Sequence, residues 1–279
     1  MATGAKMIPN ILSIAGSDSS GGAGIQADIK AISANGGFAM TAITALTAQN
    51  TCGVKAVELT PPAMVKAQLQ AVGADVRIDA VKIGMLATTE IITTVADWLA
   101  ANRPAHVVLD PVMVATSGDR LLDTRAVAAL QQLCTHADLL TPNLDELAIL
   151  AGSEPATSWT DVQEQATSVA NTLHTRVLAT GGHLRTEEGQ SCDLLVSPAS
   201  EPVWYTAPWI ATTNTHGTGC SLSAAIASHV GAGANWEQAI RAAKTWLTQA
   251  LRAADHLQVG CGSGPVHHFA TLWEQRADG

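Results

Sequence analysis

The chain has 279 residues, of which 47% are hydrophobic and only 14% are charged. Such a composition supplies a large buried core and excludes an intrinsically disordered chain. Fifteen Lys and Arg residues against 24 Asp and Glu residues give a formal net charge of −9, which argues against non-specific binding of nucleic acid or of an anionic membrane. No apolar run approaches the roughly 20 residues of a membrane span. The first residues show no secretory signal pattern, so we expect a cytoplasmic protein.

Five cysteines are present, an odd number, and no two of them are spaced as C-x-x-C. This pattern implies neither a disulfide framework nor a thiolate zinc site. We expect most of them to be ordinary buried thiols. They are Cys52, Cys134, Cys192, Cys220 and Cys261.

Short β-rich runs alternate with longer, Ala-rich amphipathic segments along the chain. The predicted strands are Asn10–Ala15, Ala39–Ala48, Val54–Leu59, Ala80–Ile83, His106–Leu109, Asp138–Leu140 and Arg176–Ala179, followed by a hairpin or edge pair at Cys192–Val196 and Val203–Tyr205. The predicted helices are Gly24–Ala34, Pro62–Val72, Thr88–Ala101, Thr124–Leu133, Asp161–Leu173, Cys220–Val230 and Trp236–Leu257. Alternating strands and helices indicate an α/β fold, with a mostly parallel sheet covered by helices on both faces. Without a linker or an internal repeat, we expect one domain over residues 1–279, with residues 1–9 as a flexible tail.

A first glycine-rich segment follows the first strand, from Ala15 to Asp28. It contains the loose pattern G-x-G-x-x-A, but Gly16 to Gly21 intervene after the strand and no acidic residue follows at dinucleotide-site spacing. A dinucleotide site is therefore the less favoured interpretation, and no Walker loop is present. Asp28 lies one turn into the next helix, where it either faces a ligand or is simply solvated.

A second glycine-rich segment, Asn214–Ile226, leads from a polar turn through Gly217, Thr218 and Gly219 into an Ala-rich helix. Glycines let successive N–H groups point the same way, and a helix N-terminus adds positive charge, so this segment predicts an anion site without a cation. Cys220 lies in the first helical turn, where the helix field is expected to lower the pKa of its thiol. The alternative is a capped core helix with an inert cysteine.

Three polar residues follow two further strands. Asn143 and Glu146 are three residues apart at a helix start, which is also the spacing of an ordinary capping pair. Asp110 ends a buried strand, where a charge needs a metal, a phosphate or donors. Together Asp110 and Glu146 make a plausible Mg²⁺ neighbourhood. An anion site beside such a carboxylate pair favours phosphoryl transfer to a hydroxyl group.

These segments resemble the ribokinase-like superfamily, specifically the hydroxymethylpyrimidine/phosphomethylpyrimidine kinases of thiamine biosynthesis, over about residues 11–273. The resemblance is carried by Ser13–Asp18 with Gly21–Asp28, by Thr44–Thr51, Val81–Leu86, Val108–Met113, Thr141–Leu144 and Asn214–Cys220, and by the tail Gly264–Phe269. It implies a three-layer α/β/α ribokinase-like fold. It also implies ATP- and Mg²⁺-dependent phosphorylation of 4-amino-5-hydroxymethyl-2-methylpyrimidine, and then of its monophosphate to the diphosphate. Because superfamily members often pair, we expect a homodimer.

The resemblance also implies roles for individual residues. Asp28 and Gln49 would hydrogen-bond the aminopyrimidine, with Met85 and Val112 as apolar walls and Gly16 in the substrate loop. The transferring phosphoryl group would be held by Gly217, Thr218, Gly219 and the amide of Cys220. Cys220 stands where many superfamily members carry an Asp base, and its thiolate could take the proton from the hydroxymethyl group. Asn143 and Glu146 would order Mg²⁺ through water, with Asp110 nearby. Thr180, Gly182 and Thr213 would line the phosphates or ribose of ATP.

Two positions depart from the family pattern. Thr180-Gly181-Gly182-His183 stands where related enzymes typically read Lys-Gly-Gly-His, and Thr116 stands where Lys is common. A lysine at position 180 would bind ATP phosphate, so its absence weakens that contact or shifts the task to Mg²⁺. The alternatives are a pyridoxal/pyridoxine kinase, whose substrate carries a similar hydroxymethyl group, and a non-catalytic protein that binds a pyrimidine or a vitamin.

Overall fold

The computed structural model describes residues 7–113, 126–182, 184 and 189–277 of the chain. Within these residues, nine strands form one sheet in the order β3-β2-β1-β4-β5-β6-β7-β8-β9. The strands are β1 (Asn10–Asp18), β2 (Phe38–Asn50), β3 (Gly53–Leu59), β4 (Ala80–Ile83), β5 (Val107–Leu109), β6 (Leu139–Leu140), β7 (Arg176–Thr180), β8 (Gln190–Val196) and β9 (Val203–Pro208). The strands from β2 to β7 in this order pair in parallel, whereas β3, β8 and β9 are antiparallel at the two edges. The predicted strands, including the β8–β9 hairpin, are confirmed.

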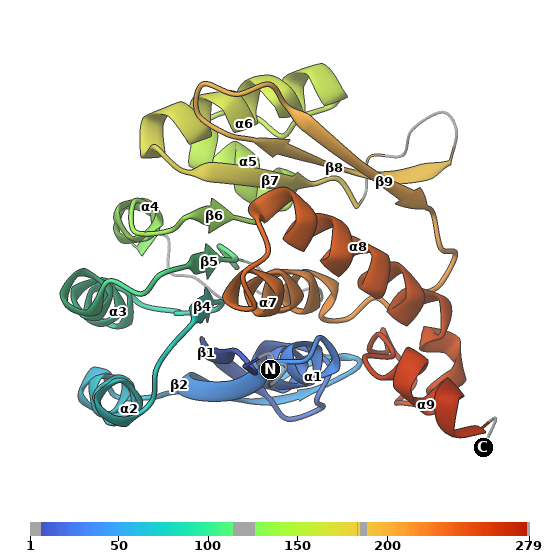
Figure 1. Ribbon diagram of the computed structural model, residues 1–279, viewed down its shortest axis with the longest axis horizontal. Helices are drawn as coiled ribbons and strands as arrows, with labels where there is room; N and C mark the ends of the chain where they lie inside the picture. The colour runs from blue at the N-terminus through green and yellow to red at the C-terminus, as the bar shows by residue number, and fades with distance from the viewer. Residues whose placement is uncertain (1–6, 114–125, 183, 185–188, 278–279) are drawn as a thin grey trace, which may run out of the picture.

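Helices cover both faces of this sheet (Figure 1). One face carries α2 (Pro62–Asp75), α3 (Thr89–Asn102), α4 (Val127–Cys134), α5 (Leu144–Ala151) and α6 (Trp159–Leu173). The other carries α1 (Gly24–Ala34), α7 (Thr218–Gly231) and α8 (Trp236–Arg252). The short 3₁₀-helix η2 (Ala254–His256) follows, and α9 (Ala270–Ala277) lies beside α8. The predicted three-layer α/β/α arrangement is therefore confirmed.

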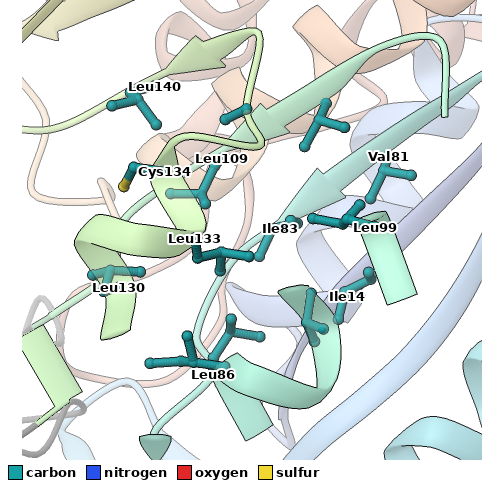
Figure 2. Close-up of a cluster of buried hydrophobic side chains, with 14 of the residues drawn as sticks. Ile14, Val81, Ile83, Leu86, Leu99, Leu109, Leu130, Leu133, Cys134 and Leu140 are labelled. Atoms are coloured by element: carbon teal, nitrogen blue, oxygen red, sulfur yellow. The ribbon is translucent and has the colours of Figure 1, made fainter. Parts of the chain in front are cut away.

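Two hydrophobic clusters flank the sheet because its central strands are buried on both faces. In β1, Ile11 packs with α1 and α7, whereas Leu12 and Ile14 point to the opposite face. The same alternation puts Val108 under α7 and Leu109 among the side chains of the cluster in Figure 2. All five of these side chains have no exposed surface. Burial of each stabilises the fold by about 1.5–3 kcal/mol relative to an exposed position.

Several helix predictions differ from the structure in their bounds. The predicted helix Trp236–Leu257 stops at Arg252, because the next turn tightens and Asp255 accepts hydrogen bonds from Thr212 and Asn214. Helix α9 was not predicted. The predicted start at Thr124 lies outside the described residues, which show α4 from Val127. No helix in the described part of the chain is both long and apolar enough to cross a membrane.

Candidate active site

A cavity of about 560 Å³ opens at the carboxyl ends of the parallel strands. This is the edge where an open α/β sheet binds its ligands. At one end the cavity is lined by Gly16, Asp18, Gln49, Met85, Val112 and His216. Its middle is lined by Lys82, Asp110, Asn143, Glu146 and the run 217–220. Its far end is lined by Thr180, Gly182, Asp193, Trp209, Thr212 and Lys244, among others. The structure therefore brings all the predicted site residues to this cavity except Asp28 and Thr213.

The start of α7 forms the predicted amide cradle. Gly217 precedes the helix with φ of 77°, a left-handed conformation that favours glycine. A Cβ atom at Gly217 would also collide with the carbonyl of Gly22, so the two glycine-rich segments pack backbone against backbone. Thr218 begins the helix, and its N–H donates to the carbonyl of Thr215 at 3.2 Å. The N–H groups of the next residues in the first turn have no acceptor within the helix, and residues 217–220 line the cavity at the positive end of the helix dipole.

Asp18 organises the first glycine-rich loop. Its carboxylate accepts hydrogen bonds from the backbone N–H groups of Ser20 at 2.8 Å, Gly22 at 3.0 Å and Ala23 at 2.8 Å. It also lies 2.9 Å from Nε2 of His216. Burial by itself raises the pKa of Asp18, but the hydrogen bonds from His216, Ser20 and the backbone hold that pKa well below its usual range. The carboxylate is therefore ionised at neutral pH.

His216 links this loop to the Gln49 end of the cavity. Its Nε2 is 3.3 Å from Nε2 of Gln49, in addition to its contact with Asp18. Gln49 is itself held by Ser19, whose Oγ accepts from the Gln49 N–H at 2.9 Å and donates to the Gln49 carbonyl at 2.8 Å. The backbone of Gln49 is thus held in place at the cavity wall. Sequence reasoning missed His216, although a histidine directly before the Gly-Thr-Gly run was a signal.

The structure does not place Asp28, which is expected to bind the aminopyrimidine, among the residues that line the cavity. Asp28 is completely buried, and its carboxylate bonds Nζ of Lys82 at 2.8 and 3.0 Å and the hydroxyl of Ser13 at 2.6 Å. The physical reason is that a buried lysine needs a counter-charge, and Asp28 on α1 supplies it. Burial by itself lowers the pKa of Lys82, but the carboxylate of Asp28 outweighs it and raises that pKa. Lys82 therefore stays cationic.

Lys82 rather than Asp28 lines the cavity. Its ammonium group interacts electrostatically with the thiol of Cys220 and the carboxylate of Asp110, so it places a positive charge beneath the amide cradle. Sequence reasoning assigned it no role. The signal was a lysine inside the four-residue buried strand β4.

The expected low pKa of Cys220 is also wrong. Burial raises the pKa of this thiol to about 12, and the carboxylates of Asp110 and Asp28 oppose ionisation as well. Lys82 and the backbone N–H of Gly24 favour the thiolate but do not compensate. In the ligand-free protein Cys220 is a neutral thiol at pH 7, so it is not a preformed base.

Asp110 and Glu146 form the predicted carboxylate pair. Burial raises the pKa of Asp110 to about 6 and that of Glu146 to about 8, and the negative charge of Asp110 adds to the shift of Glu146. Asn143 and Glu146 also form a complete capping box at the start of α5. The capping interpretation of Asn143 and Glu146 is therefore confirmed, whereas their part in Mg²⁺ binding stays a prediction.

The carboxylate pair of Asp110 and Glu146 suits a divalent cation that takes its remaining ligands from water and from a bound phosphate. The described residues contain no group of three or more His, Cys, Asp or Glu side chains placed to hold a metal. Mg²⁺ commonly binds through one or two carboxylates, with waters and substrate phosphates filling the remaining positions. Two buried carboxylates with raised pKa values, beside an amide cradle for phosphate, fit that mode.

The far end of the cavity carries a second buried ion pair. Nζ of Lys244 on α8 is 2.6 Å from Oδ2 of Asp193 on β8. Thr180 pairs with Asp193 across the β7–β8 ladder, so Lys244 lies near Thr180 through their shared neighbour. Thr213, predicted to line this end, is exposed and lies outside the cavity, whereas its neighbours Thr212 and Thr215 line it. Thr116 and His183 lie outside the described residues.

Comparison with known proteins agrees with this geometry. The family described as "Phosphomethylpyrimidine kinase" matches residues 18–267. The chain is 49% identical over 265 residues to the hydroxymethylpyrimidine/phosphomethylpyrimidine kinase of Escherichia coli K12, covering 95% of this chain and 98% of that protein. It is 50% identical over 262 residues to the thiamine biosynthesis multifunctional protein ThiED of Corynebacterium efficiens, covering 94% of this chain. The chain spans 35% of the length of that longer relative.

A solved structure supports the fold. The ADP complex of Bacillus subtilis pyridoxal kinase superposes with a TM-score of 0.86 at 32% identity, covering 96% of this chain and 100% of that chain. This match confirms the predicted ribokinase-like fold.

Proposed function

The chain belongs to the phosphomethylpyrimidine kinase family, and from this premise we propose that it is a hydroxymethylpyrimidine/phosphomethylpyrimidine kinase of thiamine biosynthesis. It transfers the γ-phosphoryl group of ATP to the hydroxymethyl group of 4-amino-5-hydroxymethyl-2-methylpyrimidine, and then phosphorylates the monophosphate. The observation that carries the proposal is one cavity lined by both Gln49 and Thr218. A polar clamp for a flat nitrogenous ring and an amide cradle for phosphate thus share one space.

The pyrimidine binds beside Gln49, His216, Met85 and Val112. The side-chain amide of Gln49 has both donors and an acceptor, which suits a ring with adjacent donor and acceptor atoms. Met85 and Val112 supply apolar contact. We assign no direct contact to Asp28, whose part is to keep Lys82 charged and in place.

The amides of residues 217–220 hold the transferring phosphoryl group, and Lys82 adds positive charge beneath them. Phosphoryl transfer depends mainly on positioning and on neutralising charge at the transferred group. Because Cys220 is a neutral thiol in the free protein, its contribution is the backbone amide together with a sulfur packed against the reacting centre. Bound Mg²⁺, held by Asp110 and Glu146 and by Asn143 through water, would neutralise charge on the ATP phosphates.

The nucleotide occupies the far end of the cavity. Thr180, Gly182 and Thr212 line the phosphates and ribose, and Lys244 supplies the cation that position 180 lacks. This arrangement is supported by the position of Lys244, close to Thr180 through their shared neighbour Asp193.

The second phosphorylation needs room for a charged acceptor. The amide-rich first loop is a poor candidate for that role, because Asp18 already binds the N–H groups of Ser20, Gly22 and Ala23. The monophosphate is therefore received near the α7 cradle and Lys82. This part of the proposal draws on the family and on the E. coli relative, whose name includes both substrates.

The direct experiment incubates the purified protein with ATP, Mg²⁺ and the hydroxymethylpyrimidine, and follows mono- and diphosphate by mass spectrometry. Absence of any phosphorylated pyrimidine refutes the proposal. The likeness to pyridoxal kinase makes pyridoxal the comparison substrate. A kcat/KM for pyridoxal above that for the pyrimidine would favour a pyridoxal kinase, and tight binding without ATP turnover would favour a non-catalytic binding protein.

We further propose a cytoplasmic homodimer. Support for the dimer comes from large apolar side chains exposed along the β2 and β3 edge of the sheet, Phe38, Leu46, Val57 and Leu59, which are 41–58% exposed. Exposed apolar groups on an edge strand favour contact with another chain. Light scattering at micromolar concentration measures the mass, and a monomer at every concentration would contradict the dimer.

A further inference from the structure

Two exposed cysteines from distant parts of the chain meet beside the cavity. Sγ of Cys52 and Sγ of Cys261 are 3.6 Å apart, although 209 positions separate them in sequence. Both residues are exposed, unlike Cys134 and Cys192, which are buried. The expectation that most of the cysteines are ordinary buried thiols is therefore wrong for this pair. Neither residue takes part in the proposed mechanism.

The backbone around the two sulfur atoms is built for close approach. Cys52 lies in the two-residue turn between β2 and β3, and Cys261 lies in the segment that follows η2. Thr51 accepts hydrogen bonds from Gly262 N–H at 3.1 Å through its Oγ1 and from Ser263 N–H at 3.0 Å through its carbonyl. A Cβ atom at Gly262 would collide with the Thr51 carbonyl, so only glycine permits this contact.

Each segment also carries part of the cavity wall. Cys52 is three residues beyond Gln49 on the β2–β3 hairpin. On the other side, the carbonyl of Gly264 accepts the backbone N–H of His216 at 3.0 Å. One sulfur atom therefore lies on the hairpin that carries Gln49, and the other lies on the segment that is hydrogen-bonded to the backbone of His216.

We propose that Cys52 and Cys261 are a modification site that forms a reversible intramolecular disulfide on exposure to a small-molecule disulfide. The thiolate of Cys52 attacks one sulfur of the oxidant and releases one small thiol, leaving a mixed disulfide. The thiolate of Cys261 then attacks the Cys52 sulfur and releases the second small thiol. The protein loses two protons and two electrons, and the oxidant is reduced to two thiols. The sulfur atoms need to approach by only about 1.5 Å to reach the length of a disulfide bond, about 2.05 Å.

The chemistry of the pair supports this order of attack. The hydrogen bond with Cys52 raises the pKa of Cys261, so Cys261 keeps its proton longer. Exposure gives the oxidant access to Cys52, whereas burial protects Cys134 and Cys192. Nothing in this step requires the kinase reaction.

The functional consequence rests on the proposed function. Drawing the hairpin turn toward Cys261 displaces Gln49, and small misplacements of a binding group reduce activity strongly. We expect oxidation to raise the KM for the pyrimidine at least threefold, while the KM for ATP changes less than twofold. The turn that carries Cys52 joins β2 and β3 at one edge of the sheet, whereas Asp193, the partner of Lys244 at the far end of the cavity, lies on β8 near the opposite edge.

The test treats the reduced protein with oxidised glutathione, alkylates the remaining thiols and digests with trypsin. Cleavage gives peptides 31–55 and 253–276, each with a single cysteine. The expected result is one peptide pair joined through Cys52 and Cys261, an intact mass lower by about 2 Da, and reversal by dithiothreitol. Cys52→Ser and Cys261→Ser are the matched controls, each expected to carry one glutathione on the remaining cysteine and no joined peptide.

Separate glutathione adducts on both cysteines of the wild-type protein, or joined peptides only in covalent dimers, would overturn the proposal. An unchanged pyrimidine KM after complete crosslinking would overturn its functional consequence. A reduced protein that crosslinks as expected but never phosphorylates the pyrimidine would instead refute the proposed function.

Discussion

The buried pair of Lys82 and Asp28 makes a prediction that separates stability from chemistry. Lys82→Met removes the cation and leaves the carboxylate of Asp28, which has no exposed surface, with Ser13 as its remaining hydrogen-bond donor among the contacts described above. Removing one partner of a buried ion pair typically costs about 3–5 kcal/mol of unfolding free energy, because the other charge is left uncompensated. We expect a loss of this size.

The double variant Asp28→Asn with Lys82→Met tests the cause. A neutral amide still accepts the hydroxyl of Ser13 and no longer needs a counter-charge. The double variant should therefore lose only about 1–2 kcal/mol, less than either single change alone. Urea unfolding of the four proteins at pH 7 gives the cycle, provided that the m-values agree. A double variant that loses the sum of the two single losses would refute the reasoning.

The same double variant then reports on catalysis. It is expected to fold, yet to transfer phosphate about tenfold or more slowly than the wild-type protein, because the charge beneath the cradle is gone. Steady-state kcat measured under saturating ATP and pyrimidine checks this. A double variant with wild-type kcat would show that Lys82 serves the fold alone.

Three further predictions concern the carboxylate pair, the nucleotide end and the cradle. Because the pKa of Glu146 is raised to about 8 in the folded protein, the folded state binds more protons than the unfolded state above about pH 4, and the free energy of unfolding falls as the pH rises to about 8. Glu146→Gln, which keeps the capping box, should flatten this pH dependence in Mg²⁺-free urea titrations. An unchanged slope would contradict the reasoning. Thr180→Lys should lower the KM for ATP about three- to tenfold with the pyrimidine KM unchanged, and a higher ATP KM would count against the assignment. Gly217→Ala should lower the free energy of unfolding by about 1–3 kcal/mol in thermal melts, because residue 217 has a positive φ and the added Cβ atom collides with Gly22. Gly182→Ala, with open space around it, should be nearly neutral. Equal losses in the two variants would be inconsistent with this account.

Much of the fold could be predicted because it depends on local pattern. The alternation of Ile11 and Leu12 between faces, and the glycines at strand ends, are visible in the sequence and suffice to indicate a parallel sheet with helices on both sides. Element ends were less predictable. The helix expected to reach Leu257 stops at Arg252, because the partners of Asp255 come from a segment about forty residues earlier.

The site was predictable where the backbone itself binds. The amide cradle at the start of α7 needs only glycines followed by a helix, and both features lie in consecutive residues of the sequence. The roles of Asp28 and Lys82 could not be predicted from the sequence, because they depend on which of these two residues, on neighbouring elements, reaches the cavity. The predicted low pKa of Cys220 was wrong for a related reason. The field of the helix can be read from the local sequence, whereas burial and the nearby carboxylates depend on the tertiary structure.

The loop around Asp18 has a consequence for how quickly a ligand can be received. The backbone N–H groups of residues 20–23 are all bound to Asp18, through its carboxylate or its own carbonyl. This segment therefore has its final shape before any pyrimidine arrives, and its conformational entropy was already lost during folding. A ligand that binds against this loop meets a preformed surface. Its association rate should therefore be limited by diffusion and orientation rather than by the ordering of the loop.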